Sequence, residues 1–177
     1  MFIDVELTPN PNARKFVLNK KIIESGSKQY NSKEEAKDDQ LAEKLFSLNG
    51  VVSVFYLSDF ITVTKDTDDS WRTSEEDIKK IITESIDNQI NTASNSVTTT
   101  LDSKLKQIDD ILEETVRPGL AMDGGGLEVV SLSDDMQLSV KYHGACGSCP
   151  SSTYGTLQAI TYILKENFHP DIEVVAV

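Results

Sequence analysis

Two cysteines separated by two residues, Cys146 and Cys149, are the side chains in this chain best suited to chemistry. The chain has 177 residues and no other cysteine. A pair this close does not form a disulfide framework, and in a reducing compartment it is more often a metal or redox site. The motif alone leaves those two roles about equally open, so its surroundings must separate them.

The segment around the cysteines, residues 144–152, favours the thiolate form of both side chains. It joins a predicted strand to a predicted helix, where unpaired backbone N–H groups and the helix dipole stabilise negative charge. Thiolate is the form of cysteine that binds metal. Gly144 and Gly147 allow close backbone turns, and Pro150 suits the first position of a helix. We expect the loop to present two anions together.

The number of thiolates limits what one chain can bind. Two are too few for a tetrahedral metal ion or for an iron-sulfur cluster, which usually takes four cysteine ligands. Because the chain has no third cysteine, something outside it must complete the site. A two-fold dimer with two such loops face to face is the simplest solution. A cluster at that junction would be easy to release, which suits a carrier better than a permanent redox centre.

Other candidate residues have plainer interpretations. His143 lies three residues before Cys146, but a histidine at a strand end is more often an ordinary packing residue, and His169 is a weaker candidate. Residues 123–126 lack the Lys and Ser/Thr of a phosphate loop, and we expect a turn beside the cysteine loop. Three aromatic side chains are expected in a core rather than on a binding surface: Phe55, Phe60 and Trp71.

Composition excludes several partner classes. The chain has 17 Lys and Arg against 29 Asp and Glu, a net charge of −12, so nucleic acid and anionic membrane surfaces would repel it. No segment approaches the roughly 20 apolar residues of a membrane helix. The first residues alternate like a strand and lack the pattern of a signal peptide. We therefore expect a cytosolic protein with neither nucleic acid nor membrane as a partner.

The first half of the chain predicts a sheet with helices. Alternating residues on either side of a turn at 8–12 predict two strands. A capping-box spacing that begins at Ser32 predicts a helix. The runs 51–57 and 60–64 predict a hairpin, and isoleucines four residues apart at 78–90 predict a helix that packs on these strands.

Residues 91–100 separate this half from the second, because they hold one valine and no charge and cannot bury enough surface to become ordered. We predict a domain at 1–90, a flexible linker at 91–100 and a domain at 101–177. The second domain has the order α-β-β-α-β: a helix from residue 101, strands at 127–132 and 137–143, a helix after Pro150, and a strand at 172–177. The fold class is α+β, with an antiparallel sheet and helices in the first domain and the CxxC motif at a strand-to-helix loop in the second.

Several motifs resemble those of NifU-like (Nfu) iron-sulfur scaffold proteins. In the second domain they are Val116-Arg117-Pro118, Asp123-Gly124-Gly125, the segment 144–152 and Thr156-Leu157. In the first they are residues 8–12, 41–46, 50–51, 54–55, 60–65 and Trp71, which resemble the N-terminal domain of the two-domain branch. Two positions depart from the family: Asp is usual at Gly126, and Gly-Ile at Ala159-Ile160. Neither is a proposed ligand.

The resemblance implies a protein that is not an enzyme. Such a protein assembles or accepts a [4Fe-4S] cluster between the two protomers of a homodimer and passes it to apo iron-sulfur proteins. Cys146 and Cys149 would bind the iron, and upstream cluster assembly proteins would be further partners. Mitochondrial members carry a transit peptide that is absent here, which indicates a bacterial cytoplasmic protein or a trimmed form in the mitochondrial matrix.

Three alternatives use the same residues. A thioredoxin-like dithiol protein needs further strands after its motif helix, whereas the residues after Cys149 allow only one helix and one strand. A zinc site in a dimer is possible, because four thiolates also suit zinc. A pure interaction module would function without either cysteine.

Overall fold

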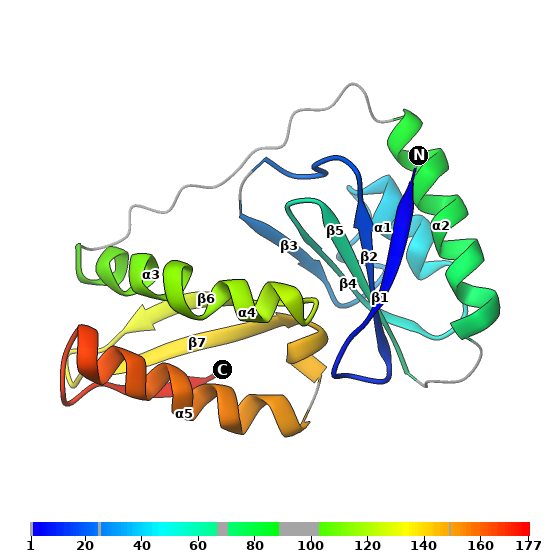
Figure 1. The fold of residues 1–177 in the computed structure, drawn as a ribbon. Coiled ribbons are helices and arrows are strands. Elements are labelled where there is room, and N and C mark those ends of the chain that lie inside the picture. Colours follow the sequence, from blue (N-terminus) through cyan, green and yellow to red (C-terminus); the bar gives the residue numbers. More distant parts are fainter. Residues whose placement is uncertain (1, 25, 67–70, 89–102, 149) are drawn as a thin grey trace. The chain divides into compact units, whose positions relative to one another are not determined.

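The computed structural model describes residues 2–24, 26–66, 71–88, 103–148 and 150–177 (Figure 1). The chain divides into two compact units, Met1–Ser96 and Val97–Val177, and each is described by itself. The predicted linker at 91–100 lies outside the described residues.

The first unit contains a five-stranded antiparallel sheet in the order β1-β2-β5-β4-β3. Its strands are β1 Ile3–Leu7, β2 Ala13–Leu18, β3 Ser27–Tyr30, β4 Val51–Leu57 and β5 Phe60–Lys65. The predicted strand pair around residues 8–12 and the predicted hairpin are confirmed. Strand β3 was not predicted; it is short and polar, and among the described strands it pairs only with β4, at the sheet edge.

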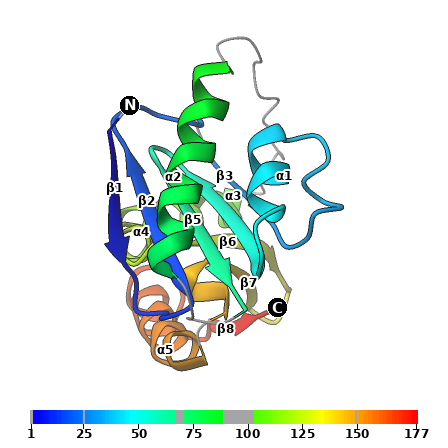
Figure 2. The same ribbon diagram turned by 90° about the vertical axis from the view of Figure 1, so that its right-hand side faces the viewer.

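Helices α1 (Gln40–Phe46) and α2 (Trp71–Asn88) both lie on one face of this sheet, in front of it in Figure 2. The predicted isoleucine stripe of α2 is confirmed, since Ile78, Ile82 and Ile86 are buried in one cluster with strand residues. The last isoleucine of that stripe, Ile90, lies outside the described residues. Apolar residues at helical spacing thus hold α2 on the sheet.

The start of α1 differs from the prediction. The Ser32 and Glu35 side chains do form capping hydrogen bonds, from Glu35 N–H to Ser32 Oγ at 3.3 Å and from Asn31 N–H to Glu35 Oε2 at 2.7 Å, but the segment consists of turns. The helix begins after Asp39, whose Oδ1 accepts hydrogen bonds from two of the first backbone N–H groups of α1. Asp39 therefore caps the helix.

The second unit contains a three-stranded sheet in the order β6-β7-β8, with β7 antiparallel to β6 and parallel to β8. Its elements are α3 Ser103–Thr115, α4 Arg117–Met122, β6 Gly125–Leu132, β7 Gln137–Gly144, a 3₁₀ turn Ala145–Ser148, α5 Pro150–Asn167 and β8 Glu173–Ala176. The α+β class is confirmed, with one helix added to the predicted order. Pro118 does not end a helix but lies in the first turn of α4.

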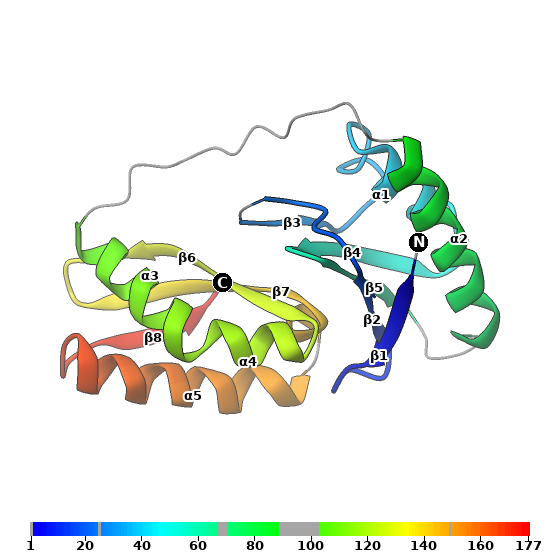
Figure 3. The ribbon, with the colours of Figure 1, turned by 45° about the horizontal axis from the view of Figure 1, so that its top comes forward.

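Helices α3 and α5 pack together with the inward residues of β6 and β7 (Figure 3). The fully buried members of this core are Ile108, Leu112, Leu138, Val140, Ile160, Leu164 and Ile172. None of the helices in the described residues is long and apolar enough to cross a bilayer. The core fixes the end of β7, where the cysteine segment begins.

Candidate functional site

The candidate site lies where β7 passes into α5. Strand β7 ends at Gly144, whose φ of 64° lies in the left-handed region that favours glycine. The 3₁₀ turn that follows holds Cys146, and α5 begins at Pro150 as predicted. Cys149 lies outside the described residues, so the geometry of the site is that of Cys146 and its neighbours.

Cys146 is packed inside the unit, with 5% of its surface exposed, and belongs to the hydrophobic core of the second unit. The reason is Gly125, at the start of β6: a Cβ atom placed there would lie 2.5 Å from Cys146 Sγ and 3.0 Å from its Cβ. The missing side chain of Gly125 leaves the room that the thiol fills.

The glycine-rich segment 123–126 positions Gly125. Gly124 has a φ of 74°, and its N–H donates to Ala121 O at 3.1 Å, which ends α4 with a left-handed glycine. The Gly124 carbonyl then accepts a 3.1 Å hydrogen bond from Ala145 N–H, next to the cysteine. The predicted turn beside the cysteine loop is therefore confirmed.

Arg117, in another of the motifs singled out from the sequence, joins α3 to β6. Its guanidinium donates to Asp109 Oδ1 at 2.5 Å and to Glu113 Oε2 at 2.7 Å, both on α3, while its Nε donates to Leu127 O at 3.2 Å. The planar guanidinium group carries several N–H donors and can reach all three acceptors at once. Arg117 thus holds the strand that supplies Gly125.

Tyr142, which sequence reasoning did not single out, lies in the same buried cluster as Cys146. It is 8% exposed, and its buried hydroxyl has no hydrogen-bond partner in the structure. Burial, and then the charge of Cys146, raise the pKa of Tyr142 to about 12. Alternation along β7 could have found it, since Leu138, Val140 and Tyr142 share the inward face.

The two histidines have ordinary surroundings. His143 Nε2 lies 3.0 Å from Glu128 Oε2 on β6. Burial lowers the pKa of His143 although Glu128 acts in the opposite direction. His169 follows the end of α5, and its Nδ1 accepts a 3.3 Å hydrogen bond from Asp171 N–H. Within the described ranges, no three His, Cys, Asp or Glu side chains gather as a metal site.

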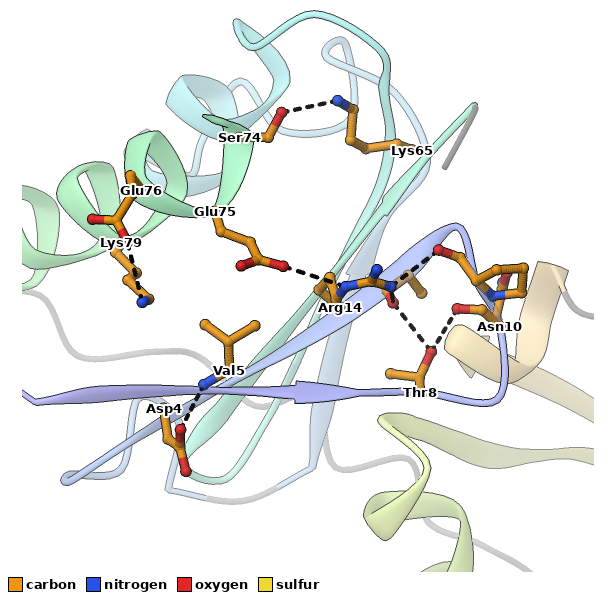
Figure 4. Close-up of polar contacts among 12 residues, drawn as sticks. Asp4, Val5, Thr8, Asn10, Arg14, Lys65, Ser74, Glu75, Glu76 and Lys79 are labelled. Carbon is orange, nitrogen blue, oxygen red and sulfur yellow. Dashed lines mark hydrogen bonds and ion pairs between the residues drawn. The ribbon is translucent and has the colours of Figure 1, made fainter. Parts of the chain in front are cut away.

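The motif at residues 8–12 in the first unit is held by polar contacts of its own chain (Figure 4). Thr8 Oγ1 donates to Asn10 O at 2.8 Å, and Arg14 Nη1 donates to Pro11 O at 3.0 Å. Arg14 Nε lies 3.3 Å from Glu75 Oε1 on α2. These contacts give the motif a role in shaping the turn between β1 and β2.

Trp71 is buried beneath two cations of the first unit. The Arg14 guanidinium carbon lies 4.9 Å and Lys65 Nζ 5.6 Å from its ring centroid. Lys65 Nζ also donates to Ser74 Oγ at 2.9 Å, as Figure 4 shows. Trp71, Phe55 and Phe60 are each at most 5% exposed, which confirms the expectation that they are buried.

The chemistry that this site allows follows from the ligand atoms that it offers. The described part of the site offers one thiol, and the second cysteine is three residues later in sequence. Soft thiolate ligands select zinc, Cu(I) or iron-sulfur clusters over hard cations such as Mg²⁺. The space beside Gly125, which the Cys146 sulfur fills, and the Tyr142 hydroxyl, which has no hydrogen-bond partner, both fit a sulfur-ligated group.

Comparison with known proteins matches both units to described families. The family described as "Scaffold protein Nfu/NifU N terminal" matches residues 3–89, and the "NifU-like domain" matches residues 108–175. The first match covers the β1–β5 unit, and the second covers the core and cysteine segment of the other unit.

Individual relatives cover nearly the whole chain. "NifU-like protein 5, mitochondrial" of Arabidopsis thaliana is 33% identical over 86% of this chain, which spans 59% of that protein's length. "NFU1 iron-sulfur cluster scaffold homolog, mitochondrial" of Homo sapiens is 31% identical over 98% of this chain and 70% of its own length. A solved NifU-like protein of Saccharomyces cerevisiae is 25% identical over 54% of this chain and 87% of its own, with a TM-score of 0.47.

Proposed function

Because the chain belongs to the two-domain NifU-like (Nfu) family of scaffold proteins, we propose that it carries an iron-sulfur cluster and passes it to apo iron-sulfur proteins. The relatives' names support the scaffold role. The cluster is cargo in this proposal, so the chain acts by binding and release rather than as an enzyme.

We propose further that the cargo is a [4Fe-4S] cluster held between two copies of the chain. Cys146 and Cys149 of each copy would supply four thiolates, the usual number for such a cluster. Support comes from the cysteine count, since one chain has only two. A two-fold axis through the two loops is the simplest way to complete the set.

The observation that carries the proposal is the packing of Cys146 against Gly125. A Cβ atom at residue 125 would lie 2.5 Å from the sulfur, so the fold reserves space there for a thiol. Cys146 lies in the 3₁₀ turn Ala145–Ser148, which precedes Cys149 and the start of α5 in the sequence. Backbone N–H groups at the start of a helix favour thiolates, and thiolates favour a cluster.

Anaerobic reconstitution with iron and sulfide tests the proposal. We expect a brown dimer with about four irons and four sulfides per two chains. Mass measured by light scattering together with iron and sulfide analysis would establish the stoichiometry. A colourless monomer after reconstitution would contradict both the cargo and the bridge.

A transfer assay separates the carrier from the dithiol alternative. The loaded dimer is mixed with the apo form of a [4Fe-4S] enzyme, and recovery of that enzyme's activity is followed with and without a chelator. A carrier restores activity in the presence of the chelator, because the cluster moves between proteins without free iron. A dithiol protein would instead reduce a model disulfide with turnover in metal-free buffer.

The location of the protein is also proposed from its relatives. The Arabidopsis and human proteins carry the word mitochondrial in their names, which favours the matrix over a bacterial cytoplasm. Fractionation of cells that express the natural gene, with detection by antibody, would decide between the two. Recovery in the cytosol alone would contradict the proposal.

A further inference from the structure

We infer that Tyr142 is a positioning residue of the cluster site, and that its hydroxyl donates a hydrogen bond to the Cys146 sulfur once that sulfur is a ligand. This inference rests on the proposed function, because the acceptor is the thiolate that binds the cargo. Tyr142 itself does not contact iron.

The register of the β6–β7 hairpin places the two side chains next to each other. Tyr142 pairs with Leu127, and Gly125 lies two residues earlier on β6, on the same face. The sulfur of Cys146 fills the space where a side chain of Gly125 would stand. It therefore occupies the diagonal neighbour position of Tyr142, which lies within reach of an aromatic side chain.

The backbone carbonyl of Tyr142 contacts the 3₁₀ turn that holds Cys146. A Cβ atom on Gly147 would lie 3.1 Å from Tyr142 O, so the 3₁₀ turn folds back over the end of β7. Tyr142 and Cys146 also belong to one buried cluster of the second unit. The backbone of Tyr142 therefore approaches the cysteine segment, and its side chain lies in the buried cluster that also holds Cys146.

The hydroxyl of Tyr142 is a donor without an acceptor. It is one of few buried side-chain polar atoms in the described residues that have no hydrogen-bond partner. Such groups are costly, and native proteins rarely keep them without a use.

Binding of Cys146 to iron changes the acceptor that is offered to the Tyr142 hydroxyl. A neutral thiol is a weak acceptor, whereas a thiolate is an ionised group that attracts a phenol donor. When Cys146 loses its proton to bind iron, the hydroxyl of Tyr142 gains a charged acceptor beside it. Hydrogen bonds to ligand sulfur withdraw electron density and favour the reduced cluster, so they raise its reduction potential. They also orient the ligand.

The test compares Tyr142→Phe with wild type after anaerobic reconstitution. Tyr162→Phe is the matched control, because the Tyr162 hydroxyl on α5 donates to Glu166 at 3.0 Å and the residue is 64% exposed. Iron and sulfide per chain, the reduction potential by voltammetry, and the rate of iron loss to a chelator are measured. For Tyr142→Phe we expect a more negative potential and iron loss about tenfold faster. Tyr162→Phe should match wild type.

The free energies of unfolding of the metal-free and the cluster-bound protein add a readout that a purely structural role of Tyr142 would not give. Without metal, Tyr142→Phe should be at least as stable as wild type, since it removes a buried donor that has no partner. With the cluster bound, Tyr142→Phe should be less stable than wild type. Equal losses of stability in both states would overturn the inference.

The outcomes separate this inference from the proposed function. Wild type that takes up no iron contradicts the proposed function. Wild type that loads, with a Tyr142→Phe potential and iron-loss rate unchanged, overturns the role of Tyr142 alone. If Tyr142→Phe does not fold, 3-fluorotyrosine at residue 142 replaces it. Its stronger donor should raise the potential, and an unchanged potential would overturn the inference.

Discussion

The sulfur of Cys146 lies 2.5 Å from the point where a Cβ atom of residue 125 would stand, so Gly125 and Cys146 share one space in the core of the second unit. The two residues lie on different elements, at the start of β6 and in the turn after β7. The pairing of Gly125 with Gly144 brings these elements together. The position of the thiol therefore depends on a glycine far away in the sequence.

Gly125→Ala should disturb the thiol and the fold of the second unit together. The added methyl would meet Cys146 Sγ at 2.5 Å, and Cys146 Cβ and the backbone oxygen of His143 at 3.0 Å. The last two atoms cannot move away without a shift of the backbone. Overpacking of this kind costs about 1–3 kcal/mol. We expect a lower free energy of unfolding by circular dichroism and reduced iron uptake on reconstitution.

Gly119→Ala is the matched control for that variant. Gly119 lies in α4, and a Cβ atom there would meet nothing within 4 Å. Alanine in a helix is favoured over glycine by roughly 0.5–1 kcal/mol, so this change should preserve or raise stability and leave iron uptake intact. Full iron uptake by Gly125→Ala would show that the space beside the thiol is not needed.

Replacement of the cysteines should separate binding from folding. Cys146→Ser and Cys149→Ser should each abolish the cluster, because a dimer would keep only two thiolates. Cys146→Ser should also lower the free energy of unfolding by about 1–3 kcal/mol, since it places a hydroxyl in an apolar cluster. Cys146→Ala, which adds no polar group, should be closer to wild type in stability. Iron retention in both serine variants would place the site elsewhere.

Periodic patterns predicted the elements that a core requires. The stripe of Ile78, Ile82 and Ile86 identified α2 because a helix turns every 3.6 residues and the stripe had to be buried. Strand β3 has no such pattern, since Ser27–Tyr30 is polar and takes its structure from pairing with β4. The sequence did not predict α4 as a separate helix, because a proline in the first turn of a helix and one that ends a helix look alike in sequence.

The sequence singled out the cysteines of the candidate site but did not indicate that Cys146 is buried. A segment rich in glycine and serine around Cys146 is typical of an exposed loop, and nothing local indicates burial. Burial follows from the β6–β7 register, which sets Gly125 against the turn. Tyr142 was missed for the same reason, because its inward position on β7 points to the site only when Cys146 is known to lie in the same buried cluster.

Arg117→Lys should weaken the second unit although it keeps the charge. Arg117 donates to Asp109, Glu113 and the carbonyl of Leu127, and an ammonium group cannot reach three acceptors on two elements. We expect a loss of about 1–3 kcal/mol in the free energy of unfolding, measured in guanidinium.

A surface ion pair provides the comparison for Arg117. Lys79 Nζ and Glu76 Oε1 lie 3.4 Å apart on α2, and the Glu76 side chain is 78% exposed. Exposed pairs of this kind contribute less than about 1 kcal/mol, so Lys79→Ala should have little effect. Equal effects of the two variants would mean that Arg117 is an ordinary surface charge.

Alkaline pH should destabilise the first unit through the tyrosines that contact Asp39. The hydroxyls of Tyr30 and Tyr56 donate to Asp39 at 3.2 and 3.3 Å. Burial first, and then the negative charge of Asp39, raise the pKa of both tyrosines. Because the folded pKa values exceed the unfolded ones, this contribution to stability is complete below a pH of about 10 and is lost as pH rises above it.

Fluorescence of Trp71, the single tryptophan of the chain, can follow this loss in the first unit. For Tyr56 the slope should reach about 1.4 kcal/mol per pH unit above pH 10. Tyr56→Phe should lower the slope above about pH 10 and leave the contribution of Tyr30, whereas Tyr162→Phe in the second unit should leave the profile unchanged. A slope as steep in Tyr56→Phe as in wild type would assign the effect to groups other than Tyr56, because a phenylalanine has no proton to release.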